Sequence, residues 1–300
     1  MNRVPQHPAQ AFAVALLAVA VLSAMDAVMK GLVIALGIYA VSLWRSLVGV
    51  ILASALYLPR RKAWPSAATL RIHLFRGAII TAMGLAFFWG LGRTPMAQAI
   101  ALTFIAPLIA LGLSAIFLGE HISRSVIGGS LVAFAGVVVI LAGQAHAELG
   151  RDALLGSIAI LFSALCYAIN IVLMRAQALA ARPAEIGFFQ NGTIAVLMVA
   201  SLPFFGGVAW PAGHELAIIA ASAMSTSGLL LFAFAYARGA ASYLSVTEYS
   251  AFIWAALFGW LVFAEPLSPF TLAGAALIVG GSLAAARKGR DLDPELEAVA

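Results

Sequence analysis

The sequence predicts an all-α membrane protein, with ten transmembrane helices arranged as two inverted five-helix repeats around a central cavity. Three observations support this fold class: the composition, the spacing of apolar runs and an internal repeat. Hydrophobic residues make up 63% of the 300 residues and charged residues 10%, whereas soluble proteins have about 45–50% and about 25%. A soluble domain of this length could not bury so much apolar surface, but a bilayer can solvate it.

Ten apolar runs are each long enough to cross a bilayer, which takes about 20 residues. Gly, Pro and charged residues separate the runs, and Pro95, Pro183 and Pro269 stand where the first turn of a helix tolerates proline. The helices are expected at 10–35, 39–58, 70–91, 95–118, 124–142, 153–175, 184–205, 214–237, 240–263 and 268–286.

The distribution of Lys and Arg predicts the orientation of these helices. With a cytoplasmic N-terminus, the outer loops hold only Arg93 and Arg151, as the positive-inside rule requires. We therefore expect residues 1–9 and 287–300 in the cytoplasm and the linker 143–152 in the periplasm, with the protein in the cell inner membrane. The cytoplasmic segments then contain Arg3, Arg60, Arg61, Lys62, Arg71, Arg124, Arg175, Arg182, Arg238, Arg287, Lys288 and Arg290.

Charged residues and glycines recur along the chain at an offset of 145 residues. The two repeats are predicted at 10–142 and 153–286. Because each holds an odd number of helices, the second must be inverted relative to the first. Inverted repeats are typical of secondary transporters, which bind substrate near the membrane midplane between the halves. The matched pairs include Arg93 with Arg238, Glu120 with Glu265, Ser123 with Ser268, Gly129 with Gly274 and Gly136 with Gly281.

Two related motifs carry a resemblance to a known family. Leu118-Gly119-Glu120-His121-Ile122-Ser123 is followed by Gly129 and Gly136, and Phe263-Ala264-Glu265-Pro266-Leu267-Ser268 is followed by Gly274 and Gly281. Each half resembles an EamA-type module of the drug/metabolite transporter superfamily. The resemblance implies ten helices, a central cavity that opens alternately to each side, and export or exchange of small metabolites. Bacterial exporters of amino acids, including aromatic ones, share this architecture.

Matching faces of the two repeats predict the residues that line the cavity. For example, Ser245, Glu248, Tyr249 and Phe252 share one face of the helix expected at 240–263. The predicted set combines aromatic side chains, Met and a few hydrogen-bonding groups, as expected for a small amphiphilic substrate. The alternative is that the aromatic residues pack helices together or face lipid. The complete set is Met25, Phe87, Thr103, Phe104, Tyr167, Asn170, Phe232, Tyr236, Ser245, Glu248, Tyr249 and Phe252.

Glu248 stands out because a carboxylate within a membrane helix costs at least about 2.5–3.5 kcal/mol. We expect it to bind a substrate ammonium group or to carry a coupling proton. The alternative is a protonated carboxyl group that bonds to a neighbouring Tyr or Thr and has only a structural role.

Other charged residues within or near the helices are expected to have structural or gating roles. Asp26 and Lys30 have the spacing and order of a helical ion pair, and Arg45 is expected at a similar depth. These three residues predict an ion pair or an outer gate. Arg76 and Arg238 are expected near the inner helix ends, with side chains that extend toward lipid headgroups.

Several other function classes lack their sequence features. The single cysteine, Cys166, excludes an intramolecular disulfide, the five histidines fall at predicted loops or helix ends, and no metal or cofactor motif is present. An enzyme, a nucleic-acid-binding protein and a channel are therefore disfavoured. An exporter of organic cations is the main alternative, because an aromatic cavity with one carboxylate suits them. The expected partners are a small-molecule substrate, with amino acids as the expected class, the lipid bilayer and a coupling proton.

Overall fold

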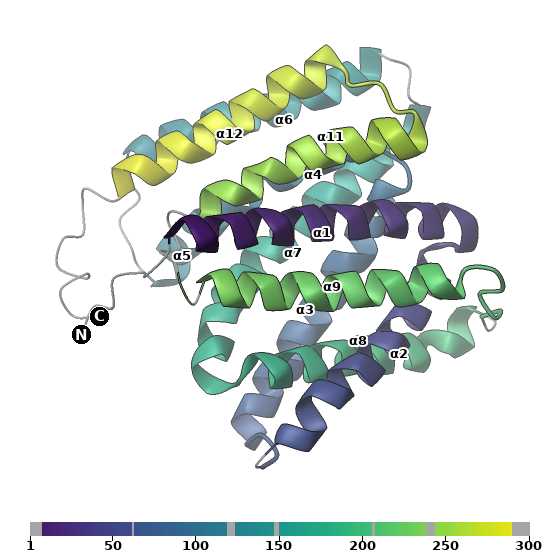
Figure 1. Cartoon of the computed structure of the whole chain (residues 1–300). Coiled ribbons are helices and arrows are strands. Elements are labelled where there is room, and N and C mark those ends of the chain that lie inside the picture. Colours follow the sequence, from purple (N-terminus) through teal and green to yellow (C-terminus); the bar gives the residue numbers. More distant parts are fainter. Residues whose placement is uncertain are drawn as a thin grey trace.

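The computed structural model describes residues 8–61, 63–118, 124–146, 150–205, 208–236, 238 and 244–289. All regular elements within these ranges are helical (Figure 1). Six helices are long and apolar enough to cross a membrane, and shorter apolar helices accompany them. The all-helical class is thus confirmed, and the chain is a multi-pass membrane protein.

The elements fall into two similar series. The first series contains α1 (Pro8–Leu36), α2 (Ile38–Tyr57), the short 3-10 helix η1 (Leu58–Arg60), α3 (Ala67–Leu91), α4 (Met96–Thr103), α5 (Ala106–Leu118) and α6 (Arg124–His146). The second series contains α7 (Gly150–Ala180), α8 (Pro183–Phe205), α9 (Glu215–Tyr236), the 3-10 helix η2 (Ser245–Tyr249), α11 (Ser250–Phe263) and α12 (Pro269–Gly289).

Turn residues fix the ends of several helices. Gly37 joins α1 to α2 with a φ of 78°, a left-handed conformation that glycine adopts without strain. Ser66 caps α3 by accepting a hydrogen bond from the backbone N–H of Thr69 at 3.2 Å. Ser268 accepts one from the N–H of Phe270 at the start of α12, also at 3.2 Å.

Helices related by the 145-residue offset pack in related pairs. Helix α1 of the first series contacts α9 of the second, and in the related pair α7 of the second series contacts α3 of the first. The remaining pairs join related helices directly, α2 with α8 and α6 with α12. Figure 1 shows α6 and α12 side by side at one edge of the molecule. Each half therefore buries its helices mainly against the other half.

Glycines allow α6 and α12 to approach closely. A Cβ atom on Gly136 would lie 2.6 Å from the backbone oxygen of Gly274, and one on Gly281 would collide with the backbone oxygen of Gly129. The two contacts are equivalent under the internal repeat, because Gly129 corresponds to Gly274 and Gly136 to Gly281. Small residues at membrane helix contacts commonly have this packing role.

Two helices that the sequence predicts as continuous are interrupted at corresponding places. The helix expected at 95–118 is divided into α4 and α5 at Phe104–Ile105. Pro107 explains this break, because it has no N–H to donate to Thr103 and its ring crowds that carbonyl group. The helix expected at 240–263 contains η2 followed by α11, and the hydroxyl groups of Thr247 and Ser250 each donate to a backbone oxygen three residues earlier, both at 2.6 Å.

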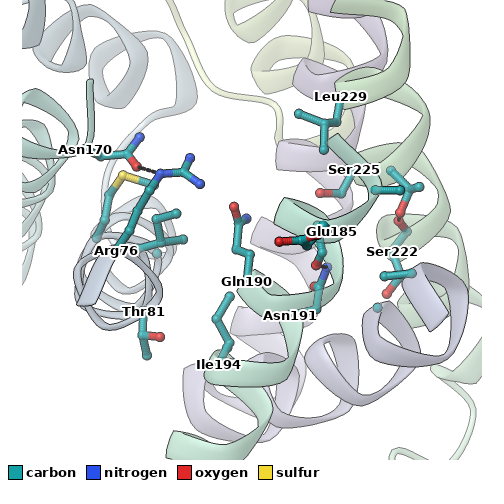
Figure 2. Close-up of a pocket in the computed structure, with 18 of the residues that line it drawn as sticks. Arg76, Thr81, Asn170, Glu185, Gln190, Asn191, Ile194, Ser222, Ser225 and Leu229 are labelled. Atoms are coloured by element: carbon teal, nitrogen blue, oxygen red, sulfur yellow. Dashed lines mark hydrogen bonds between the residues drawn. The ribbon is translucent and has the colours of Figure 1, made fainter. Parts of the chain in front are cut away.

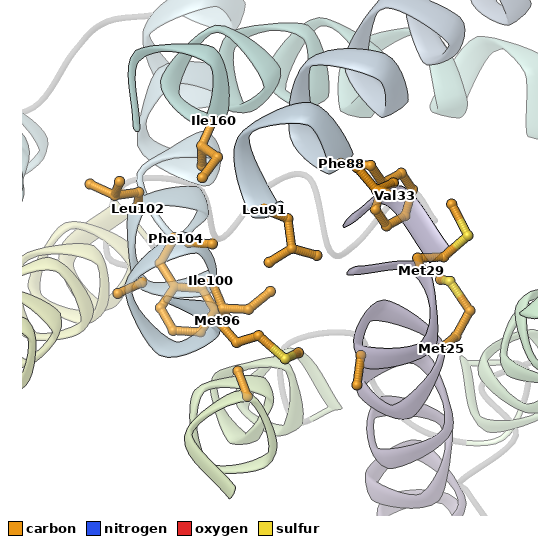
Figure 3. Close-up of a cluster of buried hydrophobic side chains, with 14 of the residues drawn as sticks. Met25, Met29, Val33, Phe88, Leu91, Met96, Ile100, Leu102, Phe104 and Ile160 are labelled. Atoms are coloured by element: carbon orange, nitrogen blue, oxygen red, sulfur yellow. The ribbon is translucent and has the colours of Figure 1, made fainter. Parts of the chain in front are cut away.

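The main apolar core joins α1, α3, α4 and α7 (Figure 3). Met29, Leu91, Met96 and Leu102 are completely buried there. Large apolar side chains also cover the outside of the molecule, including Leu131, Phe134, Leu216 and Trp260. Such exposed side chains are expected where lipid is the solvent.

Candidate functional site

A cavity of about 1220 Å³ lies between the two halves. Its wall is formed by α1 to α4 of the first series and α7 to α9 of the second. The side chains of Figure 2 show the polar part of this wall, with α3 and α7 on one side and α8 and α9 on the other. A shared cavity of this size can accommodate a small metabolite.

The cavity reaches the surface where α2 meets α3 and α7 meets α8. Arg60, Arg61, Trp64 and Arg182 line this mouth and are exposed. The guanidinium group of Arg61 lies 4.1 Å from the ring centroid of Trp64, a cation–π contact. The mouth is therefore basic and aromatic.

The opposite end of the molecule is closed by a network that we name the Lys30–Glu265 latch. The ammonium group of Lys30 on α1 forms an ion pair with Glu265, which follows α11. Lys30 also donates a hydrogen bond to the backbone oxygen of Thr94 at 2.6 Å, and Glu265 accepts one from the N–H of Met96 at 2.7 Å. The latch thus joins α1, the α3–α4 connection and the α11–α12 connection.

Polar side chains continue from the mouth to the closed end. Arg76 on α3 is buried, and its Nε donates to the side-chain oxygen of Asn170 on α7 at 2.8 Å. Figure 2 shows its guanidinium group projecting toward the space in front of Gln190 on α8. Closer to the latch, Asp26 on α1 and Arg45 on α2 both line the cavity.

Eight of the residues singled out from the sequence lie on the cavity wall. They come from both halves, as expected for a site between repeats. They are Met25, Asp26, Arg45, Phe87, Thr103, Tyr167, Asn170 and Phe232.

The other singled-out residues are placed differently. Phe104 and Tyr249 contact each other edge to face, with ring centroids 5.3 Å apart, and Phe252 packs against the apolar core. Glu248 lies on η2, off the cavity wall and within electrostatic range of Tyr167 and Tyr249. Lys30 is paired with Glu265 rather than with Asp26. The side chains of Tyr236 and Ser245 lie outside the described residues.

Arg76 differs from its expected position near a helix end, whereas Arg238 lies just beyond the end of α9. Arg76 lies nine residues after the start of α3, about 14 Å along the helix, and is 6% exposed. At this depth its partner is Asn170 rather than a lipid headgroup. Arg238 is exposed and lies over Phe234. The depth of Arg76 in its helix was the signal that could have identified it.

The sequence also gave no indication of a set of neutral polar residues on the wall. These side chains provide hydrogen-bonding groups along the cavity but no strong acid or base. Among the described residues, no group of three or more His, Cys, Asp or Glu could hold a metal ion. The set includes Ser42, Thr81, Gln190, Asn191, Ser222, Ser225 and Thr226.

A membrane-embedded cavity between two similar halves defines the class of a membrane transporter, and comparison with known proteins agrees. The family model described as the EamA-like transporter family matches residues 10–142 and again 154–287. The chain therefore belongs to the EamA-like transporter family, which confirms the resemblance and the duplication.

Several known proteins are similar to this chain. The pseudopaline exporter CntI of Pseudomonas aeruginosa is 27% identical over 276 residues, covering 91% of this chain and 94% of the exporter. A riboflavin transporter of Rhizobium johnstonii is 28% identical over 219 residues, covering 70% of this chain and 68% of the transporter. A protein of known crystal structure shares the fold, with a TM-score of 0.63 at 22% identity over 94% of this chain and 99% of its own.

Proposed function

We propose that this protein is a secondary transporter that exports or exchanges small metabolites, among them amino acids, by alternating access of the two halves. The observation that carries the proposal is a cavity lined by both halves, with an open mouth at one end and the Lys30–Glu265 latch at the other. Such an arrangement is one of the two end states that alternating access requires.

The orientation follows from the positive-inside rule. The basic residues Arg60, Arg61 and Arg182 at the mouth support a cytoplasmic mouth, and in this orientation the latch faces the periplasm. In this account ten helices cross the cell inner membrane, the two repeats 10–142 and 153–286 are inverted, and both termini are cytoplasmic. The structure is then the inward-open state, ready to receive a substrate from the cell.

The substrate class draws support from the relatives and from the cavity. The two similar transporters are named for pseudopaline and riboflavin, which are both small organic metabolites. The cavity has a volume of about 1220 Å³ and a mixed polar and apolar wall, which suits molecules from amino acids upward in size.

An exporter of organic cations is the second candidate function. Asp26, Tyr167 and Phe232 on the wall would suit a cation. Arg45 and Arg76 on the same wall oppose it, because two guanidinium groups repel a positive substrate.

Counterflow in proteoliposomes tests the proposed function. Vesicles preloaded with a mixture of amino acids should take up a labelled amino acid transiently and saturably, because a carrier exchanges solutes through one site. Empty vesicles and vesicles with heat-denatured protein are the controls. Transient uptake of a lipophilic cation instead would favour the second candidate, and non-saturating flux without counterflow would indicate a channel.

A further inference from the structure

The closed end of the cavity carries one acidic and one basic side chain. Asp26 on α1 and Arg45 on α2 both line the wall there. Arg45 lies 15 residues before Arg60 at the mouth, about 22 Å along the helix. Asp26 lies one helical turn from Lys30 of the latch. The two charges therefore face the deepest part of the cavity.

Asp26 and Arg45 interact electrostatically but are not joined directly. The two side chains have a Coulombic interaction, yet no ion pair connects them in the described part of the chain. Lys30, the neighbour of Asp26 on the same helix, is engaged by Glu265 and Thr94. The Nε atom of Arg45 is buried and has no hydrogen-bond partner within the described ranges.

Side chains from two neighbouring helices contact the backbone and the guanidinium group of Arg45. The hydroxyl group of Ser222 on α9 donates to the backbone oxygen of Arg45 at 3.1 Å, and the guanidinium group lies 5.9 Å from the ring centroid of Phe88. Apolar side chains on the same wall include Leu22, Met25 and Phe87. A charged pair is thus presented beside an apolar surface.

Electrostatics at this position favour one kind of ligand. An acid and a base that are half-buried and not paired with each other are each only partly solvated, so each gains from a partner of opposite charge. A cation would satisfy Asp26 and leave Arg45 without a counter-charge, and an anion would do the reverse. A molecule with an ammonium group next to a carboxylate can satisfy both at once.

We propose that the closed end of the cavity binds the head group of a zwitterionic substrate, with its carboxylate on Arg45 and its ammonium group on Asp26. The inference rests on the proposed function and narrows its substrate class to α-amino acids and larger amino-carboxylates. The apolar wall beside the pair then accommodates the substrate side chain. Asp26 and Arg45 act here as binding residues and not only as gate residues.

Competition of counterflow by three related solutes tests the head-group site. The labelled solute is phenylalanine, and the competitors are phenylalanine, phenethylamine without the carboxylate and 3-phenylpropionate without the ammonium group. For the unmodified protein, each singly charged solute should need about tenfold or more higher concentration than phenylalanine to inhibit by half, the loss expected for one charged contact.

Two variants should change this preference in opposite ways. Asp26→Asn should weaken inhibition by phenylalanine but leave inhibition by 3-phenylpropionate unchanged. Arg45→Gln should weaken inhibition by phenylalanine and by 3-phenylpropionate, which both carry a carboxylate, and leave inhibition by phenethylamine unchanged. Arg93→Gln is the matched control, because Arg93 is exposed and lies over Trp89 outside the cavity wall. Fluorescence-detected gel filtration establishes that each variant is folded, and Arg45→Met, which also removes the charge, replaces Arg45→Gln if the latter is not.

The outcomes separate this inference from the proposed function. Equal inhibition by all three solutes, or equal losses for all three in both variants, would overturn the zwitterion site. Saturable counterflow of riboflavin but of no amino acid would also overturn it and leave the transporter proposal standing. No counterflow of any solute in folded protein would overturn both.

Discussion

Lys30 holds the closed end of the cavity through partners on two other segments. Its ammonium group contacts Glu265 and the backbone oxygen of Thr94, and Glu265 in turn accepts the N–H of Met96. Lys30 is 4% exposed, so its positive charge depends on these partners for stabilisation. Loss of the Glu265 carboxylate should therefore weaken the contacts of the latch.

Glu265→Gln should open the latch more often. In a Cys166→Ser background, a cysteine introduced by Thr94→Cys is shielded, because Thr94 is 2% exposed. With Glu265→Gln added, its labelling by a membrane-impermeant maleimide should become about tenfold faster or more, since a loss of about 1.4 kcal/mol changes an equilibrium tenfold. Glu215→Gln is the control, because Glu215 accepts a hydrogen bond from Trp210 at the exposed surface. An unchanged labelling rate would show that the pair does not hold this end closed.

Asn170→Ala should destabilise the fold. The substitution removes the acceptor of a buried guanidinium N–H, that of Arg76, and an unsatisfied buried donor costs about 1–3 kcal/mol. Asn191→Ala is a matched control on the same wall, because Asn191 donates to Gly187 within its own helix. Thermal unfolding should show a lower midpoint only for Asn170→Ala, and equal midpoints would argue that the Arg76–Asn170 bond contributes little.

Glu248→Gln should transport normally. Glu248 does not line the cavity, although it lies within electrostatic range of Tyr167, so a neutral side chain of the same shape should change the counterflow rate by less than about twofold at neutral and mildly acidic pH. A rate that falls strongly, or that loses its dependence on a proton gradient, would instead support the hypothesis that this carboxyl group carries a coupling proton.

At the scale of the elements, the contact between α6 and α12 depends on glycine. Gly136→Ala should lower stability by about 1–3 kcal/mol, the usual cost of overpacking, because the new Cβ would lie 2.6 Å from the backbone oxygen of Gly274. Gly128→Ala on the same helix meets nothing within 4 Å, so it should be neutral or stabilising. Thermal unfolding of both variants in detergent separates them, and equal effects would contradict a close helix contact at Gly136.

The elements also show how far sequence reasoning reaches. Apolar run lengths and punctuation locate the helices, but the helix expected at 95–118 is broken between α4 and α5, where Pro107 provides the physical reason. The 3-10 segment η2 contains no proline or glycine, so its departure from α-helical geometry could not be inferred from residue type. A Thr or Ser hydroxyl group can donate to a backbone oxygen three or four residues earlier in an ordinary α-helix as well. Residue type alone therefore does not distinguish a 3-10 segment from an α-helix, and tertiary packing decides which one forms.

The site shows the same division between local and tertiary information. The repeat correctly indicates that both halves contribute to one cavity, because that follows from topology. The i, i+4 spacing of Asp26 and Lys30 favours a local ion pair, yet Lys30 is engaged by Glu265, 235 residues away. An i, i+4 ion pair within one helix contributes only about 0.2–0.5 kcal/mol, so a buried partner from another segment can replace it. Helix spacing alone cannot identify such a partner.

At the scale of the whole molecule, the two halves meet directly at the closed end. A Cβ atom on Gly259 of α11 would lie 3.4 Å from the Cβ of Met96 of α4, and 2.7 Å from the carboxylate of Glu265, whose side chain would have to shift. The distance to the Cβ of Met96 is close to the separation of the Cβ atoms in a disulfide, about 3.5–4.5 Å. If transport requires the halves to separate here, a disulfide between these positions should trap the state with the cytoplasmic mouth open.

The most direct test of alternating access is counterflow by Met96→Cys/Gly259→Cys in a Cys166→Ser background, before and after oxidation. The reduced protein should carry its substrate, the oxidised protein should not, and reduction should restore transport. Met96→Cys alone, treated in the same way, should be unaffected by oxidation. Counterflow that continues at an undiminished rate in fully cross-linked protein would contradict the account, because the substrate would then cross without opening of the closed end.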